Sequence, residues 1–470
     1  MKKNSIILLV LFICSFSFSQ PTQVLDINIG NSSSNPSNLF VHNGLIFFSA
    51  DDSGGINTPG GMDLGREIWV SDGTSGGTIF FKDLNNGSSS SSPNNFFLLN
   101  GNLYFSAISG SENTLFTTDG TELGTQATTV SMQLNSPVEL GGTIYFVNAT
   151  DRRLYEFNGT ASNPVAGSGN EYIQDYKIKA FDGKLFCYMN TSTQIGTVGT
   201  ELYAYDPTLD SFQLIKDIGG GQLDSDLLNF TVLGTELYFT AFSELELWKT
   251  DGTEIGTVGI SAASPISNFD NLYGWNERLF LEGDNQLWVY NPALDSVTNL
   301  SNLTGAFPNH DPSDYVELDG WLYYRGEDSN DNDGHLWRTD GSSTFQLDDT
   351  IINVDDIVAL NDKLYFEGSN GTDGNELFEF DPASLSIDEF SNIDKISVYP
   401  NPTSEFINIK SSTPVNEIEL RNMLGQLILK TDQEKINISV LQSGTYLIKI
   451  ITDKERIIKK IVVSRSAIKG

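Results

Sequence analysis

The phrase ELWKTDGTEIGT at Glu246–Thr257 recurs in weaker copies along most of the chain, and this repetition constrains the fold more than any other feature. The copies are EIWVSDGTSGGT (Glu67–Thr78), TLFTTDGTELGT (Thr114–Thr125), HLWRTDGSS (His335–Ser343) and ELFEFDP (Glu376–Pro382). Each is preceded by a turn and an apolar strand, most clearly in NGNLYFSA (Asn100–Ala107), LGTELYFTA (Leu233–Ala241) and LNDKLYFEG (Leu360–Gly368). A tandem repeat of this kind predicts an array of one repeated supersecondary unit.

The length of the repeat indicates the architecture. Aligned apolar positions fall at Ile46, Leu103, Ile144, Leu185, Leu237, Leu279, Leu322 and Leu364, mostly 41 to 43 residues apart. A period of about 42 residues with four strand signals per unit is typical of a propeller blade, and no helical periodicity is present. The sequence therefore predicts an all-β fold: an eight-bladed β-propeller over residues 20–393, with seven blades as the alternative. Asn100-Gly101 predicts a type I′ hairpin turn.

The segment VLDINIG (Val24–Gly30) resembles the last strand of a unit, as in LIKDIGG (Leu214–Gly220). We expect it to pair with the final unit and close the ring, because closure removes the free strand edges of an open sheet. The longest insertions, at Gly54–Arg66 and Ser192–Thr200, fall at one position of the repeat and so predict loops on one face.

The first 19 residues are typical of a signal peptide. Lys2 and Lys3 precede an apolar run from Ile6 to Ile13, and small residues precede a cleavage site before Gln20. Lipid attachment at Cys14 is the alternative, disfavoured by the bulky residues before it. No later stretch is long and apolar enough to span a membrane. The mature chain then holds a single cysteine, Cys187, which excludes an internal disulfide.

Charge divides the chain in two. Residues 21–393 carry 13 Lys and Arg against 53 Asp and Glu, whereas residues 394–470 carry 12 against 8. An acidic surface favours solubility, and calcium binding is the alternative interpretation. Nucleic acid and anionic lipid are disfavoured as partners because binding phosphate requires clustered Lys and Arg.

The pattern changes after residue 393. Short strands of alternating apolar residues, with turns at Pro400, Gly425 and Gly444, predict a small Ig-like β-sandwich over residues 394–470. This stretch resembles the type A carboxyl-terminal sorting domain of the type IX secretion system. The matching residues are Val398, Tyr399, Pro400, Asn401, Pro402, Gly425, Gly444, Tyr446, Lys459 and Lys460. The resemblance implies that the secretion machinery is a partner and that the protein reaches the cell surface or the medium.

Residues 24–393 resemble the ELWxxDGT-type propeller repeats of large secreted bacterial proteins, on the phrases quoted above. That resemblance implies a propeller scaffold and no activity. The recurring Asp of the phrase (Asp72, Asp119, Asp251, Asp340) is interpreted as a turn former, because Asp before Gly bonds its own backbone two residues on.

The best metal candidate is the loop EDSNDNDGHLW (Glu327–Trp337). Asp328, Asp331, Asp333 and Asp340 approach the spacing of oxygen ligands around calcium, although no Glu closes the loop. A solvated hairpin loop without metal is the alternative.

The chain has three histidines, and none lies in a spacing typical of a Ser-His-Asp triad or a metal site. The sequence also contains no G-x-S-x-G elbow, H-E-x-x-H motif or P-loop. The sequence therefore predicts an exported, non-catalytic binding or adhesion propeller with an extracellular glycan or protein ligand. The alternatives are a polysaccharide hydrolase or lyase, for which a cluster of carboxylates at one mouth would speak, and a structural surface component. Trp275 and Trp321, in or beside turns, are candidates for a carbohydrate platform.

Overall fold

A computed structural model describes residues 20–464 apart from 55, 131–133, 168–170, 192–197, 243–245, 265, 304–308, 329–332, 386–395, 400–402, 404, 412–413, 423–426 and 453–455. The signal peptide predicted at residues 1–19 lies outside this range. The chain divides into two compact units, one over residues 20–381 and one from Pro382 onward. No helix in the described part has the length and hydropathy that a membrane crossing requires.

The described residues of the first unit form eight four-stranded sheets, in which neighbouring strands are antiparallel. Seven of these sheets are meanders of four successive strands. The first sheet contains β2 (Ser37–His42), β3 (Leu45–Asp51), β4 (Arg66–Ser71) and β5 (Ile79–Lys82), and the second contains β6 (Asn94–Leu99), β7 (Asn102–Ser109), β8 (Glu112–Thr118) and β9 (Gln126–Ala127). The third sheet contains β10 (Leu134–Leu140), β11 (Thr143–Asn148), β12 (Leu154–Phe157) and β13 (Ser162–Pro164). The fourth sheet contains β14 (Glu171–Phe181), β15 (Lys184–Thr191), β16 (Glu201–Asp206) and β17 (Ser211–Lys216). The fifth sheet contains β18 (Leu228–Leu233), β19 (Glu236–Thr240), β20 (Leu247–Thr250) and β21 (Val258–Gly259). The sixth sheet contains β22 (Asp270–Trp275), β23 (Arg278–Gly283), β24 (Gln286–Asn291) and β25 (Ser296–Asn299). The seventh sheet contains β26 (Ser313–Leu318), β27 (Trp321–Gly326), β28 (His335–Thr339) and β29 (Thr344–Gln346).

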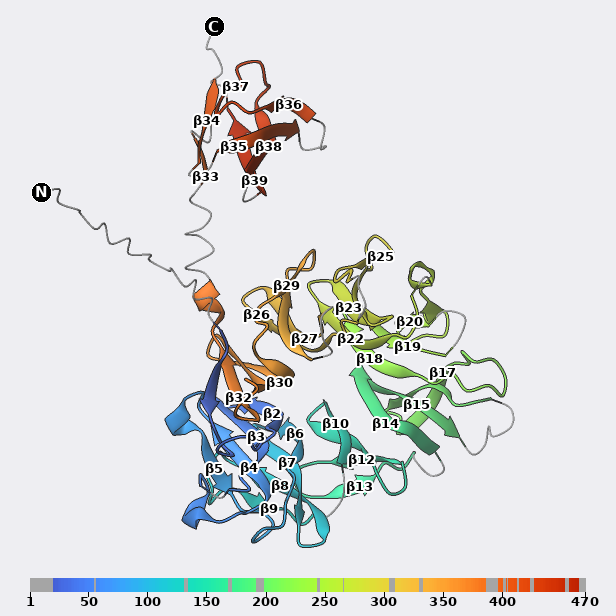
Figure 1. The fold of residues 1–470 in the computed structure, drawn as a ribbon. Coiled ribbons are helices and arrows are strands. Elements are labelled where there is room, and N and C mark those ends of the chain that lie inside the picture. The colour runs from blue at the N-terminus through green and yellow to red at the C-terminus, as the bar shows by residue number, and fades with distance from the viewer. Residues whose placement is uncertain are drawn as a thin grey trace, which may run out of the picture. The chain divides into compact units, whose positions relative to one another are not determined.

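The eighth sheet joins the two ends of the unit. It consists of β30 (Ile352–Leu360), β31 (Lys363–Ser369) and β32 (Asn375–Phe380), completed by β1 (Thr22–Leu25), which pairs antiparallel with β32. The first strand of every meander contacts the first strand of the next, and β30 contacts β2, so the inner strands form a closed circle. Figure 1 shows the orange β30 and β32 beside the blue β2 and β3. The fold is therefore an all-β propeller. The predicted pairing of the Val24–Gly30 segment with the last unit is confirmed, but the strand lies nearer the N-terminus: it spans Thr22–Leu25, and residues 26–30 follow it.

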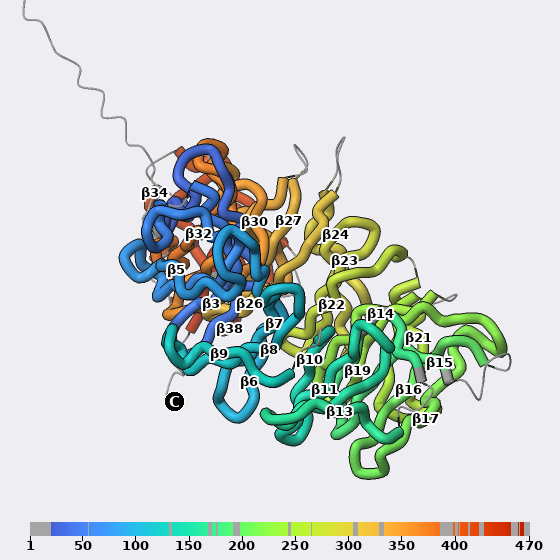
Figure 2. Tube along the Cα trace, turned by 90° about the horizontal axis from the view of Figure 1, so that it is seen from below, coloured from blue at the N-terminus to red at the C-terminus, as the bar shows by residue number. Residues whose placement is uncertain are grey.

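Each hydrophobic core joins two neighbouring sheets. Phe47 and Phe81 of the first meander, for example, pack with Leu103, Phe105 and Phe116 of the second. Phe47 and Phe81 meet edge to face at 5.6 Å, and Phe105 stacks on Phe116 at 5.6 Å. The view in Figure 2 shows the tube passing from one sheet to its neighbour in chain order. Burial of apolar surface between successive sheets thus holds the ring together.

The turn between the first two strands of each sheet is a tight hairpin. Asn43-Gly44, Asn100-Gly101 and Asp319-Gly320 have positive φ at both central residues, as do four other pairs: Gly141-Gly142, Asp182-Gly183, Asn276-Glu277 and Asn361-Asp362. Type I′ turns require this conformation, which Asn, Asp and Gly adopt at least cost. In the turn between β18 and β19 only Gly234 has positive φ. The hairpin turn predicted at Asn100-Gly101 is confirmed.

The DGT phrase forms the hairpin between the third and fourth strands. Asp119 Oδ1 accepts hydrogen bonds from the backbone N–H (2.9 Å) and the hydroxyl (2.7 Å) of Thr121. Thr121 Oγ1 accepts from Gly124 N–H at 2.9 Å, and the hydroxyl of Thr125 donates to Thr121 O at 2.7 Å. The equivalent bonds around Asp72 and Asp251 have nearly the same lengths. In all three repeats the Asp side chain thus bonds to the backbone two residues on, as predicted for a turn-forming residue.

The last glycine of this phrase is required by the Asp carboxylate. A Cβ at Gly124 would lie 2.0 Å from Asp119 Oδ1, and the equivalent distances at Gly77 and Gly256 are also 2.0 Å. A methyl group cannot occupy that place. The spacing D-G-T-x-x-G is thus the local requirement of one folded hairpin.

A buried glutamate at the start of the third strand fastens each of three sheets to its neighbour. Glu67 of β4 accepts hydrogen bonds from the N–H of Leu84 (2.9 Å) and from the N–H (3.0 Å) and hydroxyl (2.5 Å) of Ser91. Leu84 and Ser91 belong to the segment that leads from β5 to β6. The side chain therefore fixes the crossing from one sheet to the next.

Glu376 of β32 holds the ring closure in the same manner. It accepts from Ile27 N–H and Ser34 N–H, both at 2.9 Å, and from the Ser34 hydroxyl at 2.6 Å. Glu201 of β16 accepts from Ile218 N–H at 2.7 Å. Burial raises the pKa of all three carboxyl groups to about 7, against the hydrogen bonds that lower it.

The second unit is a small β-sandwich. One sheet contains β33 (Ile396–Tyr399), β34 (Phe406–Ser411) and β37 (Lys435–Asn437), and the other β36 (Leu427–Thr431), β35 (Val415–Asn422), β38 (Gly444–Thr452) and β39 (Arg456–Val463). Side chains of both sheets, among them Ile407, Ile436, Leu420 and Ile448, share one core. Alternating apolar residues on the inner faces build this core, as the sequence pattern predicts.

Candidate functional site

The predicted calcium ligands are placed only in part. Asp328 and Asp333 lie in the loop between β27 and β28, and Asp331 lies outside the described residues. Asp340 follows β28, and its Oδ1 accepts from Ser342 N–H (2.8 Å), the Ser342 hydroxyl (2.7 Å) and Ser343 N–H (2.9 Å). Asp340 thus forms a turn, like its counterparts in the other repeats. Among the described residues, no three His, Cys, Asp or Glu side chains are grouped to hold a metal ion. Calcium binding at this loop stays a prediction.

A ring of polar residues marks the inner strands. In seven sheets the first strand carries a non-glycine residue with positive φ at a bulge: Asn38, Asn95, Ser136, Asn229, Asn271, Asp314 and Asp356. We call these seven residues the polar collar. Asn and Asp adopt this left-handed conformation more readily than other side chains, which explains their choice. Because the first strands contact one another around the ring, the polar collar runs along its inner side.

Carboxylates concentrate along one arc of the polar collar, on the sheets that begin with β22, β26, β30 and β2. Asp314 of β26 and Asp355 of β30 lie close enough to share a hydrogen bond between neighbouring sheets. Burial and the Asp355 charge raise the pKa of Asp314 to about 7. Burial likewise raises the pKa of Glu282 and of Glu367 to about 7. Two carboxyl groups in contact favour sharing a proton or binding a cation.

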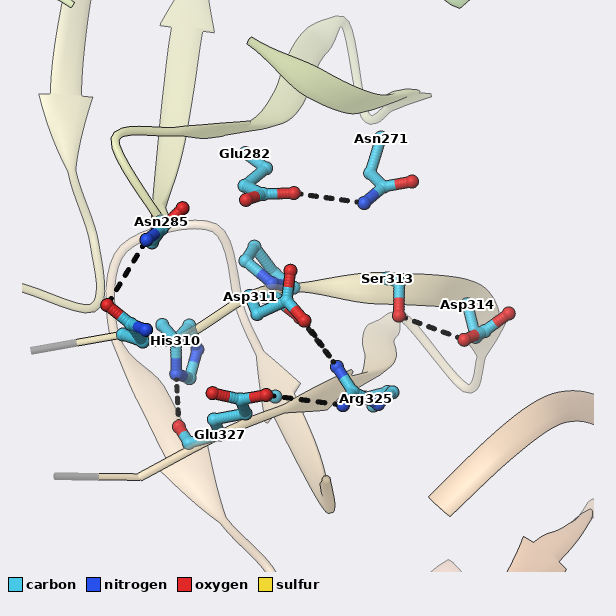
Figure 3. Close-up of polar contacts among 12 residues, drawn as sticks. Asn271, Glu282, Asn285, His310, Asp311, Ser313, Asp314, Arg325 and Glu327 are labelled. Carbon is cyan, nitrogen blue, oxygen red and sulfur yellow. Dashed lines mark hydrogen bonds and ion pairs between the residues drawn. The ribbon is translucent and has the colours of Figure 1, made fainter. Parts of the chain in front are cut away.

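Two arginines offset part of this negative charge. Arg325 Nη1 contacts Asp311 Oδ2 at 3.0 Å and its Nη2 contacts Glu327 Oε1 at 3.4 Å (Figure 3). Glu282 accepts a hydrogen bond from Asn271 Nδ2 at 3.0 Å, as Figure 3 also shows. The guanidinium of Arg66 donates to backbone oxygens of Ser34 and Ser49. The arc remains rich in acceptors and acidic overall.

His310 lies beside this arc, but its side chain is buried in the hydrophobic core. It is fully buried, with Nδ1 at 2.8 Å from Glu327 O and Nε2 at 3.0 Å from Tyr324 Oη. Its ring meets Trp337 edge to face at 4.7 Å. Burial lowers its pKa to about 4, so the imidazole is neutral at physiological pH. Both ring nitrogens are engaged by structural partners.

The predicted carbohydrate platform at the two tryptophans is wrong for Trp275. That side chain ends β22, is 8% exposed and packs on Phe280 in the core that also contains Leu322. Trp321 lies under the guanidinium of Arg338, 4.0 Å from the ring centroid, and against Phe345. A ring face covered by an arginine is not free to stack on a sugar.

The predicted sorting residues lie on three strands of the second unit. Val398 and Tyr399 end β33, Gly444 and Tyr446 begin β38, and Lys459 and Lys460 lie on β39. Val398 and Tyr446 pack against the sandwich core, and Tyr446 Oη donates to Gln442 O at 3.0 Å. Pro400, Asn401, Pro402 and Gly425 lie outside the described residues.

Residues 397–464 match the family model described as a secretion system C-terminal sorting domain. This segment is a type IX sorting domain. The resemblance seen in the sequence is confirmed there, and the domain implies interaction with the secretion machinery. It indicates export to the cell surface or the medium. No curated protein matches the chain.

Solved structures resemble the chain weakly. The extracellular domains of BT4673 and BT3049 from B. thetaiotaomicron are each 11% identical, with TM-scores of 0.28 and 0.27; the matches cover 91% of this chain and 81% and 72% of theirs. A chain from a study of two prolyl endopeptidases is 12% identical with a TM-score of 0.39, and the match covers 91% of this chain and 55% of that one. Values this low transfer no function, so the architecture rests on the strand pairing itself.

Sequence reasoning missed the polar collar and the buried glutamates. A signal for the collar exists: a pair of Asn, Asp or Ser residues precedes the apolar part of six of the eight first strands, as in SNLF, NNFF and SDYV. For the glutamates, Ser91 and Ser225 follow Glu67 and Glu201 at the same separation of 24 residues.

Proposed function

We propose that the mature chain is an exported, non-catalytic binding or adhesion propeller whose ligand docks at the polar collar. An extracellular glycan is the ligand class that fits best, with a protein as the alternative. The proposal includes the signal peptide at residues 1–19 as the first export step and membership of the propeller unit in the ELWxxDGT-type repeats.

The polar collar is the observation that supports this function. It brings amide, hydroxyl and carboxylate groups from seven sheets to the inner side of the ring, and amides both donate and accept hydrogen bonds. Sugar hydroxyls are matched by such a mixture. The carboxylates of the Asp314 arc favour a neutral or cationic ligand over a phosphate-rich one.

The test is a glycan and protein array probed with residues 20–470. Asn38→Gly and Asn229→Gly remove collar amides at φ +58 and +59, where glycine keeps the backbone conformation. Asn100→Gly makes the same change in a hairpin turn away from the collar, at φ +52. We expect binding that the two collar substitutions weaken at least about tenfold and the turn substitution leaves unchanged. Equal effects from all three, or no ligand on either array, would contradict the proposal.

A polysaccharide hydrolase or lyase is the second candidate, because the Asp314–Asp355 pair includes a carboxyl group with a pKa of about 7. Such an acid is suited to proton transfer. Their mutual hydrogen bond weighs against it, since glycosidase carboxyl groups stand about 5 to 9.5 Å apart. Polysaccharide turnover that Asp314→Asn abolishes would replace the binding function with this one.

A further inference from the structure

An unpartnered carboxylate oxygen is buried in the loop between β3 and β4. Asp52 is 1% exposed, and its Oδ2 accepts a hydrogen bond from Asn57 N–H at 2.6 Å. Its Oδ1 is shielded from solvent and has no hydrogen-bond partner among the described residues. Buried charges in proteins are paired or coordinate a metal, because leaving one unpaired is costly. Asp52 therefore lacks a positively charged or donating neighbour at that oxygen.

A second oxygen faces the same space from another part of the chain. A Cβ placed on Gly54 would lie 3.6 Å from Asp52 Oδ1 and 3.7 Å from Asn28 Oδ1, and no other atom of the described residues beyond its chain neighbours lies within 4 Å. Asn28 is 4% exposed, and its Nδ2 donates to Ser33 O at 3.0 Å and Ser53 Oγ at 3.1 Å. These bonds fix the orientation of the amide, and Oδ1 takes only a 3.3 Å contact from Ser53 Oγ.

The surroundings are negatively charged. Asp26 Oδ1 and Asp51 Oδ1 are also shielded from solvent, and neither has a hydrogen-bond partner in the part of the chain that the structure describes. Burial and the Asp63 charge raise the pKa of Asp51, and Asp52 adds to the effect while Arg66 opposes it. Asn57 Nδ2 ties the two loops together through Asp26 O at 3.1 Å and Ile27 O at 2.8 Å.

We propose that the space between Asp52 Oδ1 and Asn28 Oδ1 binds a calcium ion, completed by backbone carbonyl oxygens and water. A donor set of oxygens alone excludes soft metals, and calcium accepts amide oxygens in irregular geometry more readily than magnesium does. Among the described residues no three His, Cys, Asp or Glu side chains are grouped to hold a metal ion, so at most two carboxylates belong to this site. It is separate from the loop around Asp333.

The consequence concerns ring closure. Asn28 follows β1, which pairs with β32 of the last sheet, whereas Asp52 follows β3 of the first meander. A cation between them would fasten the closing strand to the first meander. Calcium would then stabilise the folded ring by binding it and not the unfolded chain.

The experiment titrates residues 20–470, freed of metal by chelator, with calcium chloride in a calorimeter and in thermal melts. Asp52→Asn removes the charge at constant size, and Gly54→Ala fills the space with a methyl group at ordinary contact distances. Asp349→Asn, at an exposed position, is the matched control, and Asp333→Ala removes the other candidate loop.

We expect calcium to bind and to raise the melting temperature of the parent, Asp349→Asn and Asp333→Ala proteins. Asp52→Asn and Gly54→Ala should each weaken binding at least about tenfold and abolish the temperature shift. In chelator, Asp52→Asn should melt no lower than the parent, because an uncompensated charge has been removed. Absence of calcium binding, loss of binding only in Asp333→Ala, or an equal response to magnesium would overturn the assignment.

Discussion

Replacing Glu376 by alanine tests whether buried glutamates hold the ring closed. Ile27 N–H would lose Glu376, its one acceptor among the described residues. Ser34 N–H keeps a second acceptor, Asn375 O at 3.0 Å, which the Ser34 hydroxyl also approaches at 3.4 Å. One buried donor left unsatisfied, together with the space vacated by the side chain, costs about 2–4 kcal/mol. We expect Glu376→Ala to lower the free energy of unfolding by that amount at pH 5.

The same substitution should matter less at higher pH. The pKa of Glu376 rises from its ordinary 4.5 to about 7 in the fold, because burial disfavours the charged form. Its stabilising contribution is therefore complete below pH 4.5 and is lost as the pH rises through about 7. The shift corresponds to about 3 kcal/mol, so the difference between Glu376→Ala and the parent should shrink toward zero at pH 8.

Equilibrium urea unfolding of residues 20–470, followed by tryptophan fluorescence between pH 5 and 8, measures both effects. Glu376→Gln is the matched variant, because glutamine already occupies the equivalent position at the start of the third strand in the sixth sheet. There, the amide oxygen of Gln286 accepts hydrogen bonds from Ser301 Oγ (2.8 Å) and Leu303 N–H (2.9 Å). It should cost about 1 kcal/mol and lack the pH dependence. A Glu376→Ala change within about 0.5 kcal/mol of the parent at pH 5 would refute the reasoning.

Three further predictions follow from other parts of the first unit. Gly124→Ala should destabilise the protein by about 1–3 kcal/mol, because a Cβ there would lie 2.0 Å from the Asp119 carboxylate. Gly76→Ala is the control and should not destabilise the protein, because no described atom beyond its chain neighbours lies within 4 Å of a Cβ at that position. If adding Asp119→Ala to Gly124→Ala recovers no stability, the proposed clash is contradicted. Asp314→Asn should flatten the fall in the urea midpoint as the pH rises through about 7, since the raised pKa makes the acid form the stabilising one; an unchanged slope would count against it. Cys187, buried and with a raised pKa, should resist iodoacetamide in the native protein and react after unfolding, as mass spectrometry would show; rapid native alkylation would contradict its burial.

Local turn chemistry carried most of what could be predicted from the sequence. Asn100-Gly101 and the Asp119 hairpin are specified by neighbouring residues, so their conformations follow from the letters alone. The closing strand after Thr22 was recognisable because it repeats the pattern of a fourth strand. These features depend on contacts within a few residues or on the repeat itself.

The rest depends on contacts between segments that are far apart. Asp314 and Asp355 meet only because successive inner strands lie side by side, and nothing in either segment alone predicts the meeting. Trp275 was misjudged for the same reason, since its burial is decided by the core beneath the turn. The role of Glu67 required knowing that the crossing segment at Ser91 folds back onto β4.

The buried glutamates also bear on how an exported chain is held together without a disulfide. Cys187 is buried and unpaired, so within the described residues no disulfide connects the first sheet to the last. Glu376 instead receives Ile27 and Ser34, which lie more than 340 residues earlier in the chain. A buried carboxyl group that accepts several hydrogen bonds restrains the crossing segment, and its contribution to stability depends on its protonation. Ring closure in this protein should therefore respond to pH, as a disulfide would not.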